Sequence, residues 1–151
     1  MSEHKAKIIW SRTTPDFVYE TYNREHRLEF EGGQVVKASA APEYHGSANC
    51  VDPEKALVAA AASCHMLTFL ALAARKKIVV DGYTDAAIGI LEQNADGKIA
   101  VTKIALNPKI KLAAGAKLSD EEIHTLHTKA HHHCFIANSI ISRITVNGQE
   151  V

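Results

Sequence analysis

The sequence predicts an α+β fold, and three observations lead to that class. Short β-favouring segments occupy the first forty residues, one long apolar helix is expected in the middle, and further strands and two helices follow. The 151 residues are enough for a sizeable core, so we expect a single domain over 1–151. Hydrophobic residues make up 46% and charged residues 23%, which is typical of a globular protein.

The N-terminal part predicts strands at 6–10, 17–22 and 26–40. Val, Ile, Tyr and Phe are frequent in these segments, and such residues favour extended backbone. Gly32-Gly33 predicts a hairpin turn inside the last segment. Residues 41–50 contain Pro, Gly, Ser and Asn and predict a loop before the long helix.

The long helix has clear signals at both ends. Asp52 predicts its N-cap, Pro53 its first residue, and the basic residues 75–77 suit its C-terminus. Together they predict about 25 residues of helix. The stretch 56–74 is long enough to cross a bilayer, but it is mostly alanine and carries three polar residues. We therefore favour a helix buried at the centre of a soluble protein.

The remainder of the chain alternates strands and helices. The segment 79–113 predicts strands with a hairpin at Asp96-Gly97. Residues 118–133 predict a second helix with a capping box from Ser119 to Glu122. A third helix is expected to begin near Cys134, and 143–148 predicts the last strand.

Charge and cysteine content narrow the function classes. Lys+Arg and Asp+Glu balance at 17 each, so no net charge attracts the protein to nucleic acid or to an anionic membrane. The first ten residues lack the apolar core of a signal peptide. Three cysteines in such a chain favour catalytic, redox or metal-binding use over structural disulfides. We expect a cytoplasmic protein with neither nucleic-acid nor membrane partners.

Cys64 and Cys134 are the leading candidates for chemistry. Cys64 lies in the middle of the apolar helix, where a small buried hydrophobe is the alternative interpretation. Cys134 lies at an expected helix start, where free N–H groups favour a thiolate. The two would form a redox couple if their sulfurs meet, although 70 positions (134 minus 64) separate them. Cys50, in the preceding loop, is interpreted as incidental.

Two charged residues fit a reactive thiol. Glu54 precedes Cys64 by ten residues, about 15 Å along one helix, so it reaches such a thiol only from a second chain packed antiparallel. The alternative role of Glu54 is to complement the helix dipole. Arg24 is by default a surface residue, but an arginine beside a thiol stabilises the thiolate and can orient a peroxide oxygen.

The histidines suggest an alternative metal site. Six candidate ligands share one segment: His124, His127, His131, His132, His133 and Cys134. The first three fall on one helix face, and zinc binds such side chains. No CxxC or HExxH cluster accompanies them, and a solvated polar face explains the pattern, so we expect no metal or other cofactor.

Three stretches, 22–33, 51–74 and 126–139, together resemble the OsmC/Ohr superfamily of thiol-dependent peroxidases. The similarity is closest to the OsmC-like branch with Cys-His-Met in the long helix. It implies an OsmC-like fold in which a long central helix is packed in β-sheets. It also implies an intertwined homodimer with two sites at the interface.

The resemblance implies a role for each candidate residue. Cys64 matches the peroxidatic cysteine, Cys134 the resolving cysteine, and Glu54 the acidic member of an Arg–Glu pair. Arg24 is the best match to the arginine, with Arg27 as the alternative. The implied reaction reduces organic hydroperoxides to alcohols. A dithiol restores the enzyme, and in related enzymes this reductant resembles dihydrolipoamide on lipoylated proteins.

Apolar neighbours of the cysteines would line the substrate pocket, although an ordinary core fits them equally well: Met66, Phe69, Phe135 and Ile136. His65 follows Cys64 at a position where the hydroperoxide-resistance branch usually has an aromatic or other apolar residue. On a helix the side chains of these two neighbours diverge by about 100°. The roles of His65 and of the run His131–His133 therefore stay open. Two other functions also stay open: acyl transfer by Cys64 with a histidine base, and a metal- or ligand-binding dimer that uses the histidine-rich segment.

Overall fold

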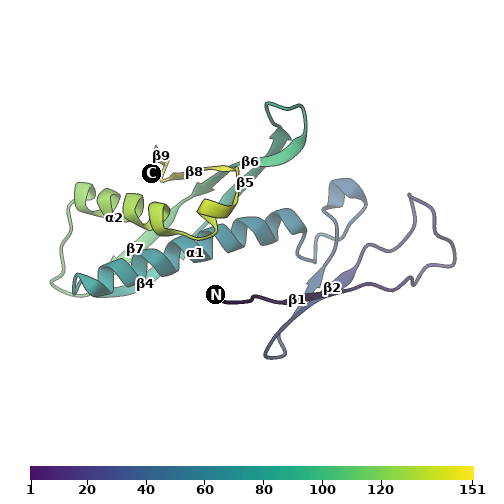
Figure 1. The fold of residues 1–151 in the computed structure, drawn as a ribbon, viewed down its shortest axis with the longest axis horizontal. Coiled ribbons are helices and arrows are strands. Elements are labelled where there is room, and N and C mark those ends of the chain that lie inside the picture. The colour runs from purple at the N-terminus through teal and green to yellow at the C-terminus, as the bar shows by residue number, and fades with distance from the viewer. The chain divides into compact units, whose positions relative to one another are not determined.

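The structure is a computed structural model that describes all of residues 1–151. The chain forms two compact units, Met1–Ala56 and Leu57–Val151. The predicted α+β class is confirmed, because two α-helices accompany nine strands in three sheets (Figure 1).

A three-stranded antiparallel sheet forms the N-terminal unit. β1 (Ala6–Ile9) pairs with β2 (His26–Phe30), which pairs with β3 (Val35–Ala38). The predicted hairpin turn between β2 and β3 is confirmed. Gly32 and Gly33 have φ of 89° and 83°, a backbone conformation that glycine adopts without steric cost. A short 3-10 helix, η1 (Pro42–Tyr44), follows the sheet.

The predicted strand over 17–22 is wrong, because this segment belongs to a long loop between β1 and β2. The side chain of Asn23 bonds to two backbone groups near the start of that loop and closes it on itself. The Phe17 ring packs against Trp10 and Tyr22, with centroids 5.9 and 5.2 Å away. The aromatic residues that suggested a strand therefore stabilise a loop.

The long helix, α1 (Pro53–Arg75), begins and ends as predicted and has 23 residues. Asp52 caps its N-terminus, since its Oδ1 accepts the backbone N–H of Lys55 at 2.7 Å. At the other end the chain reverses through Lys77, whose φ is 59°.

Only one face of α1 is buried within the chain. The buried residues recur every four positions: Ala61, His65, Phe69 and Ala73. By length and composition alone α1 meets the requirements of a membrane span, with a mean hydropathy of 1.9, and 22% of that window is buried. On another face Leu67 is 60% exposed. We expected α1 to be buried on all sides, but within the single chain it is buried on one face only. Its other face is exposed.

Two sheets form most of the C-terminal unit, and the hairpin at Asp96-Gly97 is confirmed, with a φ of 75° at Gly97. β6 pairs with β5 in antiparallel and with β8 in parallel, and β8 turns through Asn147-Gly148 into β9, a strand that was not predicted. The two-stranded sheet consists of β4 (Val80–Asp85) and β7 (Pro108–Leu112). The four-stranded sheet consists of β5 (Ile88–Gln93), β6 (Ile99–Leu106), β8 (Arg143–Val146) and β9 (Gln149–Glu150).

The second helix, α2 (Asp120–His133), has the predicted capping box, since Ser119 and Glu122 each accept the other's backbone N–H. The expected helix from Cys134 onward is wrong. Cys134 is the C-cap of α2 with extended backbone, and only one 3-10 turn, η2 (Ala137–Ser139), follows. Ile140 is already extended and packs against the core, so this apolar segment leads into β8 instead of forming a helix.

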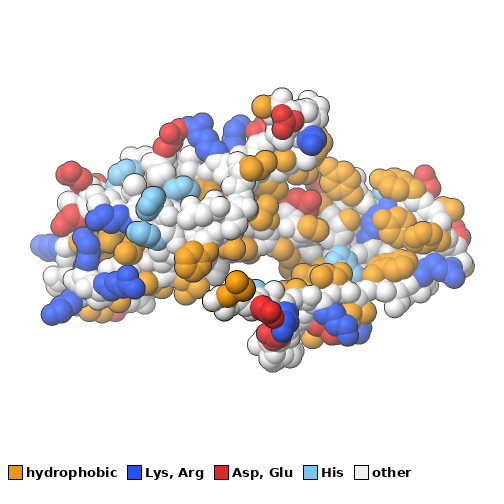
Figure 2. Space-filling model, in the orientation of Figure 1, with side chains coloured by type: hydrophobic (Ala, Val, Ile, Leu, Met, Phe, Trp, Pro, Cys, Tyr) orange, Lys and Arg blue, Asp and Glu red, His pale blue; other side chains and the backbone are white.

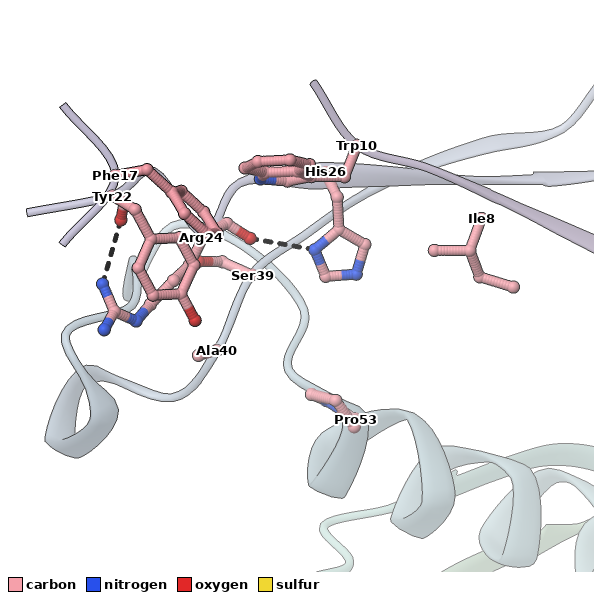
Figure 3. Close-up of a pocket in the computed structure, with 9 residues that line it drawn as sticks. All are labelled: Ile8, Trp10, Phe17, Tyr22, Arg24, His26, Ser39, Ala40 and Pro53. Atoms are coloured by element: carbon pink, nitrogen blue, oxygen red, sulfur yellow. Dashed lines mark hydrogen bonds between the residues drawn. The ribbon is translucent and has the colours of Figure 1, made fainter. Parts of the chain in front are cut away.

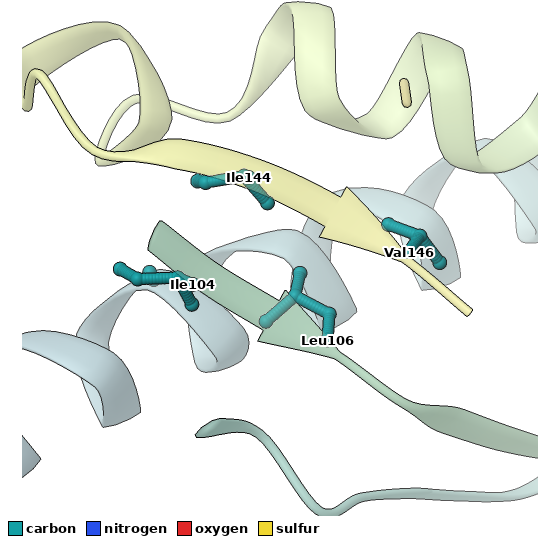
Figure 4. Close-up of a cluster of buried hydrophobic side chains, with 5 residues drawn as sticks. Ile104, Leu106, Ile144 and Val146 are labelled. Atoms are coloured by element: carbon teal, nitrogen blue, oxygen red, sulfur yellow. The ribbon is translucent and has the colours of Figure 1, made fainter. Parts of the chain in front are cut away.

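Two clusters of buried side chains hold the C-terminal unit together. The first joins α1 to β6 and β8 (Figure 4): Ala61, Ile104, Leu106, Ile144 and Val146. The second joins α1 to α2: Phe69, Ala73, Leu126 and Ala130. Because α1 takes part in both clusters, it fixes the position of Cys64 within this unit.

Candidate functional site

The two candidate cysteines come together in the C-terminal unit. Cys64 is partly buried on α1, and Cys134 is 1% exposed at the C-cap of α2. Burial, and then the neighbouring Cys64 thiol, raise the pKa of Cys134 to about 11. Both are free thiols. Folding therefore makes neighbours of two cysteines that are far apart in the sequence.

The end of α2 holds Cys134 in place. Its backbone N–H donates to the carbonyl of His131 at 3.1 Å, and its Sγ accepts the N–H of Ala137 at 3.4 Å. The expectation that free N–H groups would favour a Cys134 thiolate is wrong. Cys134 ends a helix instead of starting one, and burial outweighs the N–H groups that its sulfur accepts, so the pKa rises.

His65 and His127 form a buried pair that joins α1 to α2. His65 Nε2 lies 2.9 Å from His127 Nδ1, and the rings stack at 13° with centroids 5.2 Å apart. The residues are 1% and 2% exposed. Burial first, and then neighbouring histidines, lower the pKa of each to about 4, so both rings are neutral at pH 7. No local pattern predicts this pairing, because the two histidines are 62 positions apart in the sequence.

Arg24 lies in the N-terminal unit and is only 9% exposed. Its guanidinium donates to the carbonyls of Tyr19 and Tyr22 at 2.5 and 2.9 Å, and lies 4.1 Å from the centroid of the Tyr22 ring. Arg24, Tyr22 and Phe17 help to line a largely apolar pocket of about 450 Å³, and Figure 3 shows these three side chains close together. Arg24 is thus a buried cation beside an aromatic pocket.

Arg24 and Arg27, the two candidates for the active-site arginine, have different environments. Arg27, on β2, has a side chain 54% exposed and pairs with Glu29 at 2.7 Å on the same strand. Glu54 is partly buried in the first turn of α1, and its carboxylate forms no salt bridge with Arg24 within the chain. The position of Arg24 in a pocket favours it over Arg27.

The four apolar residues expected around the substrate have different environments. Phe69 is fully buried, stacks on His127 with centroids 4.6 Å apart, and belongs to the core. Ile136 packs against the first cluster and Met66 is partly buried, whereas Phe135 is 82% exposed. Phe69 therefore offers no surface to a ligand.

The histidine-rich segment lies on α2, and Figure 2 shows histidine side chains gathered over that helix. No three His, Cys, Asp or Glu side chains are brought together in a way that could hold a metal ion. His132 and His133 are exposed, and His131 is partly buried. No observation thus favours the alternative of a metal centre.

Comparison with known proteins gives a family and a fold. A family model described as "OsmC-like protein" matches residues 46–148. The structure of an OsmC-like protein of unknown function from Vibrio cholerae matches with a TM-score of 0.93 and 41% identity, covering 97% of this chain and 99% of that one. A search of curated proteins finds no match.

More distant structures carry names that refer to peroxide resistance. An organic hydroperoxide resistance protein OsmC from Legionella pneumophila matches with a TM-score of 0.71 and 20% identity, covering 97% of this chain and 94% of that one. One from Elizabethkingia anophelis matches with a TM-score of 0.68 and 18% identity, covering 96% and 94%. At these identities the likeness shows the fold alone.

Proposed function

The chain belongs to the OsmC-like family, and from this premise we propose that it is a thiol-dependent peroxidase that reduces organic hydroperoxides to alcohols. Cys64 is the peroxidatic cysteine and Cys134 the resolving cysteine. The observation that carries the proposal is the nearness of two free thiols from distant parts of the sequence. Structures of this fold include organic hydroperoxide resistance proteins, which point to the same redox role.

The reaction has three steps. The Cys64 thiolate attacks one oxygen of ROOH, the O–O bond breaks, and the departing RO⁻ takes up a proton to leave as ROH, so that Cys64 becomes a sulfenic acid. The Cys134 thiol then condenses with this sulfenic acid to give a disulfide and water. A dithiol, such as dihydrolipoamide on a lipoylated protein, reduces the disulfide by two exchanges and is itself oxidised to a cyclic disulfide.

The environment of Cys134 suits a resolving thiol. Its raised pKa keeps it protonated at neutral pH, so it does not compete with Cys64 as the first nucleophile. In the condensation step its proton leaves with the sulfenic hydroxyl group as water. The neighbouring Cys64 thiol is the proposed partner of Cys134 in the disulfide.

Arg24 and Glu54 are proposed to complete the site. Arg24 is the better arginine because it is buried beside an apolar pocket, whereas Arg27 is on the surface. A fixed positive charge stabilises a thiolate and the developing oxyanion of the leaving group. The pocket that accepts the organic part of the hydroperoxide is proposed to include Met66, Phe135 and Ile136.

A homodimer is part of the proposal. The uncovered face of α1 is apolar, with Leu67, Ala71 and the alanines Ala59 and Ala60 exposed. An exposed apolar face of this length is typical of a protein interface, and small side chains let two helices approach closely. We place this dimer in the cytoplasm, where dithiol reductants keep cysteines reduced.

The first experiment follows peroxide consumption by the reduced protein. Cumene hydroperoxide and hydrogen peroxide are compared, with dihydrolipoamide or dithiothreitol as reductant. We expect turnover of the organic peroxide, its loss in Cys64→Ser, and formation of a Cys64–Cys134 disulfide seen by intact mass and peptide mapping. Cys50→Ser is the matched control and should keep full activity.

Three results would contradict the proposal. Absence of turnover in the wild type refutes peroxidase activity. Full multiple-turnover activity in Cys134→Ser refutes its resolving role, because the dithiol then reduces the Cys64 sulfenic acid directly. A monomer in sedimentation equilibrium at micromolar concentration refutes the dimer.

A further inference from the structure

We propose that the His65–His127 hydrogen bond is a positioning lock that sets how Cys64 faces Cys134. The inference rests on the proposed use of these cysteines as a redox pair, and it gives a function to two histidines outside the reaction steps. Neither ring is proposed to touch the substrate, so the two are positioning residues.

The placement of the pair along the helices carries the first part of the argument. His65 directly follows Cys64 on α1, and His127 precedes Cys134 by seven residues, about 10 Å along α2. Their bond of 2.9 Å is the one side-chain hydrogen bond that joins α1 to α2. The polar link between the two helices thus involves the residue that follows Cys64 on α1 and a residue about two turns before Cys134 on α2.

The rest of the contact between the helices is poorly directional. Phe69 and Ala73 of α1 meet Leu126 and Ala130 of α2, and two of these four residues are alanines. Apolar contacts depend on buried area and tolerate small rotations and shifts. A hydrogen bond weakens steeply when its distance or angle changes. The histidine pair therefore selects one rotation of each helix among those that the apolar contact allows.

Burial of the two histidines makes it costly to break their hydrogen bond. Both imidazoles are almost completely buried, and His127 is also stacked on Phe69. Between two neutral rings one N–H donates to one unprotonated nitrogen, and breaking that bond leaves buried polar atoms without a partner. A shift of α1 against α2 consequently costs more here than at an apolar contact, and Cys64 and Cys134 move with these helices.

The test measures thiol pairing without peroxide. In a Cys50→Ser background, the protein is equilibrated with reduced and oxidised glutathione, and the free thiols are alkylated and counted by mass. Two thiols are oxidised while one glutathione disulfide becomes two glutathiones. The equilibrium constant of this exchange reports how well the two sulfurs are placed.

Two variants separate the lock from simple packing. His127→Leu removes the hydrogen bond, and we expect the equilibrium constant to fall roughly tenfold, as for a lost buried hydrogen bond. His127→Asn keeps an amide group near the position of Nδ1 and should stay within about threefold of wild type. Leu106→Ala, in the other cluster, is the stability control and should leave the constant unchanged.

The outcomes distinguish this inference from the proposed function. An unchanged constant in folded His127→Leu overturns the lock while leaving the redox pair intact. An equal fall in Leu106→Ala also overturns it, because the effect then follows stability. If the wild type forms no disulfide in any glutathione mixture, the redox pair itself is refuted. If the disulfide forms and depends on His127 but no peroxide is consumed, the lock stands and the peroxidase proposal falls.

Discussion

The side chain of Val58 occupies the space that a β-carbon on Gly89 would fill. A Cβ built on Gly89 lies 2.4 Å from Val58 Cγ2, so β5 approaches α1 closely at a point where only glycine fits. Val58 packs against the first core cluster and has little freedom to move. The glycine is therefore a packing requirement of the sheet that covers the cysteine-bearing helix.

Gly89→Ala should destabilise the protein by about 1–3 kcal/mol through overpacking. Urea unfolding followed by circular dichroism measures the change. Gly82→Ala is the matched control, since a β-carbon there meets only Lys111 Cβ at 3.6 Å and should be close to neutral. Val58→Ala in the Gly89→Ala background should recover part of the loss. A Gly89→Ala protein as stable as wild type would contradict this reading of the contact.

The buried histidine pair predicts a loss of stability in mild acid. Burial lowers the pKa of His65 and His127 to about 4 from ordinary values near 6.5, so between these values the unfolded chain binds more protons than the folded one. Stability is therefore full above pH 6.5 and falls as the pH drops toward 4, by roughly 1–2 kcal/mol per pH unit for the coupled pair.

Chemical denaturation at fixed protein concentration between pH 7.5 and 4.5 checks this dependence. The double variant His65→Gln, His127→Asn should flatten the profile, because it removes both titrating rings. His132→Asn with His133→Asn is the control on the same helix, and it should keep the slope, since both residues are exposed. A slope that survives loss of the buried pair would show that other groups cause it.

Cys134 should be slow to alkylate in the native protein. Its pKa of about 11 lies above that of a free thiol near 8.5, so at pH 8 the thiolate population is lower by roughly a hundredfold. Iodoacetamide labelling with peptide mapping measures the rate, and the rate should rise about tenfold per pH unit up to pH 10. In urea Cys134 should react as fast as an ordinary thiol. Rapid native labelling at pH 8 would contradict the raised pKa.

Lys77→Gly should stabilise the protein by about 1 kcal/mol. Lys77 has a φ of 59°, and its N–H donates to Ala74 while that of Ile78 donates to Ala73, which is a Schellman motif at the end of α1. A left-handed conformation costs a residue with a β-carbon about 1–2 kcal/mol, and glycine avoids this cost. Lys76→Gly is the control and should not stabilise. A lower melting temperature for Lys77→Gly would refute the argument.

Local signals in the sequence were sufficient for much of the fold. Asp52 and Pro53 mark the start of α1, Ser119 and Glu122 the start of α2, and Gly97 a hairpin, because each bonds or bends the backbone within a few residues. The prediction of a strand over 17–22 fails because its aromatic residues pack on one another and on Trp10. Trp10 lies outside this segment, so the composition of the segment alone does not indicate the contact.

The site was less accessible to sequence reasoning. Cys64 and Cys134 stood out as single residues, but their nearness depends on how α2 packs on α1, and no local pattern encodes that packing. The prediction that a helix begins near Cys134 is wrong because Ile136 and Ile140, which follow it, pack on the core as the chain leads into β8. The pairing of His65 with His127 also depends on how α2 packs on α1, so the sequence did not predict it.

The parallel pairing of β6 with β8 has a consequence for the timing of synthesis. β8 closes the connection that carries α2 and Cys134, so this part of the sheet is complete only when nearly the whole chain exists. The ribosome adds about 5–20 residues per second, and the 70 residues from Cys64 to Cys134 therefore take roughly 4–14 seconds. During that interval the nascent chain carries the Cys64 thiol before its proposed partner Cys134 has been made, so an oxidant that reaches Cys64 then leaves a sulfenic acid that Cys134 cannot yet resolve.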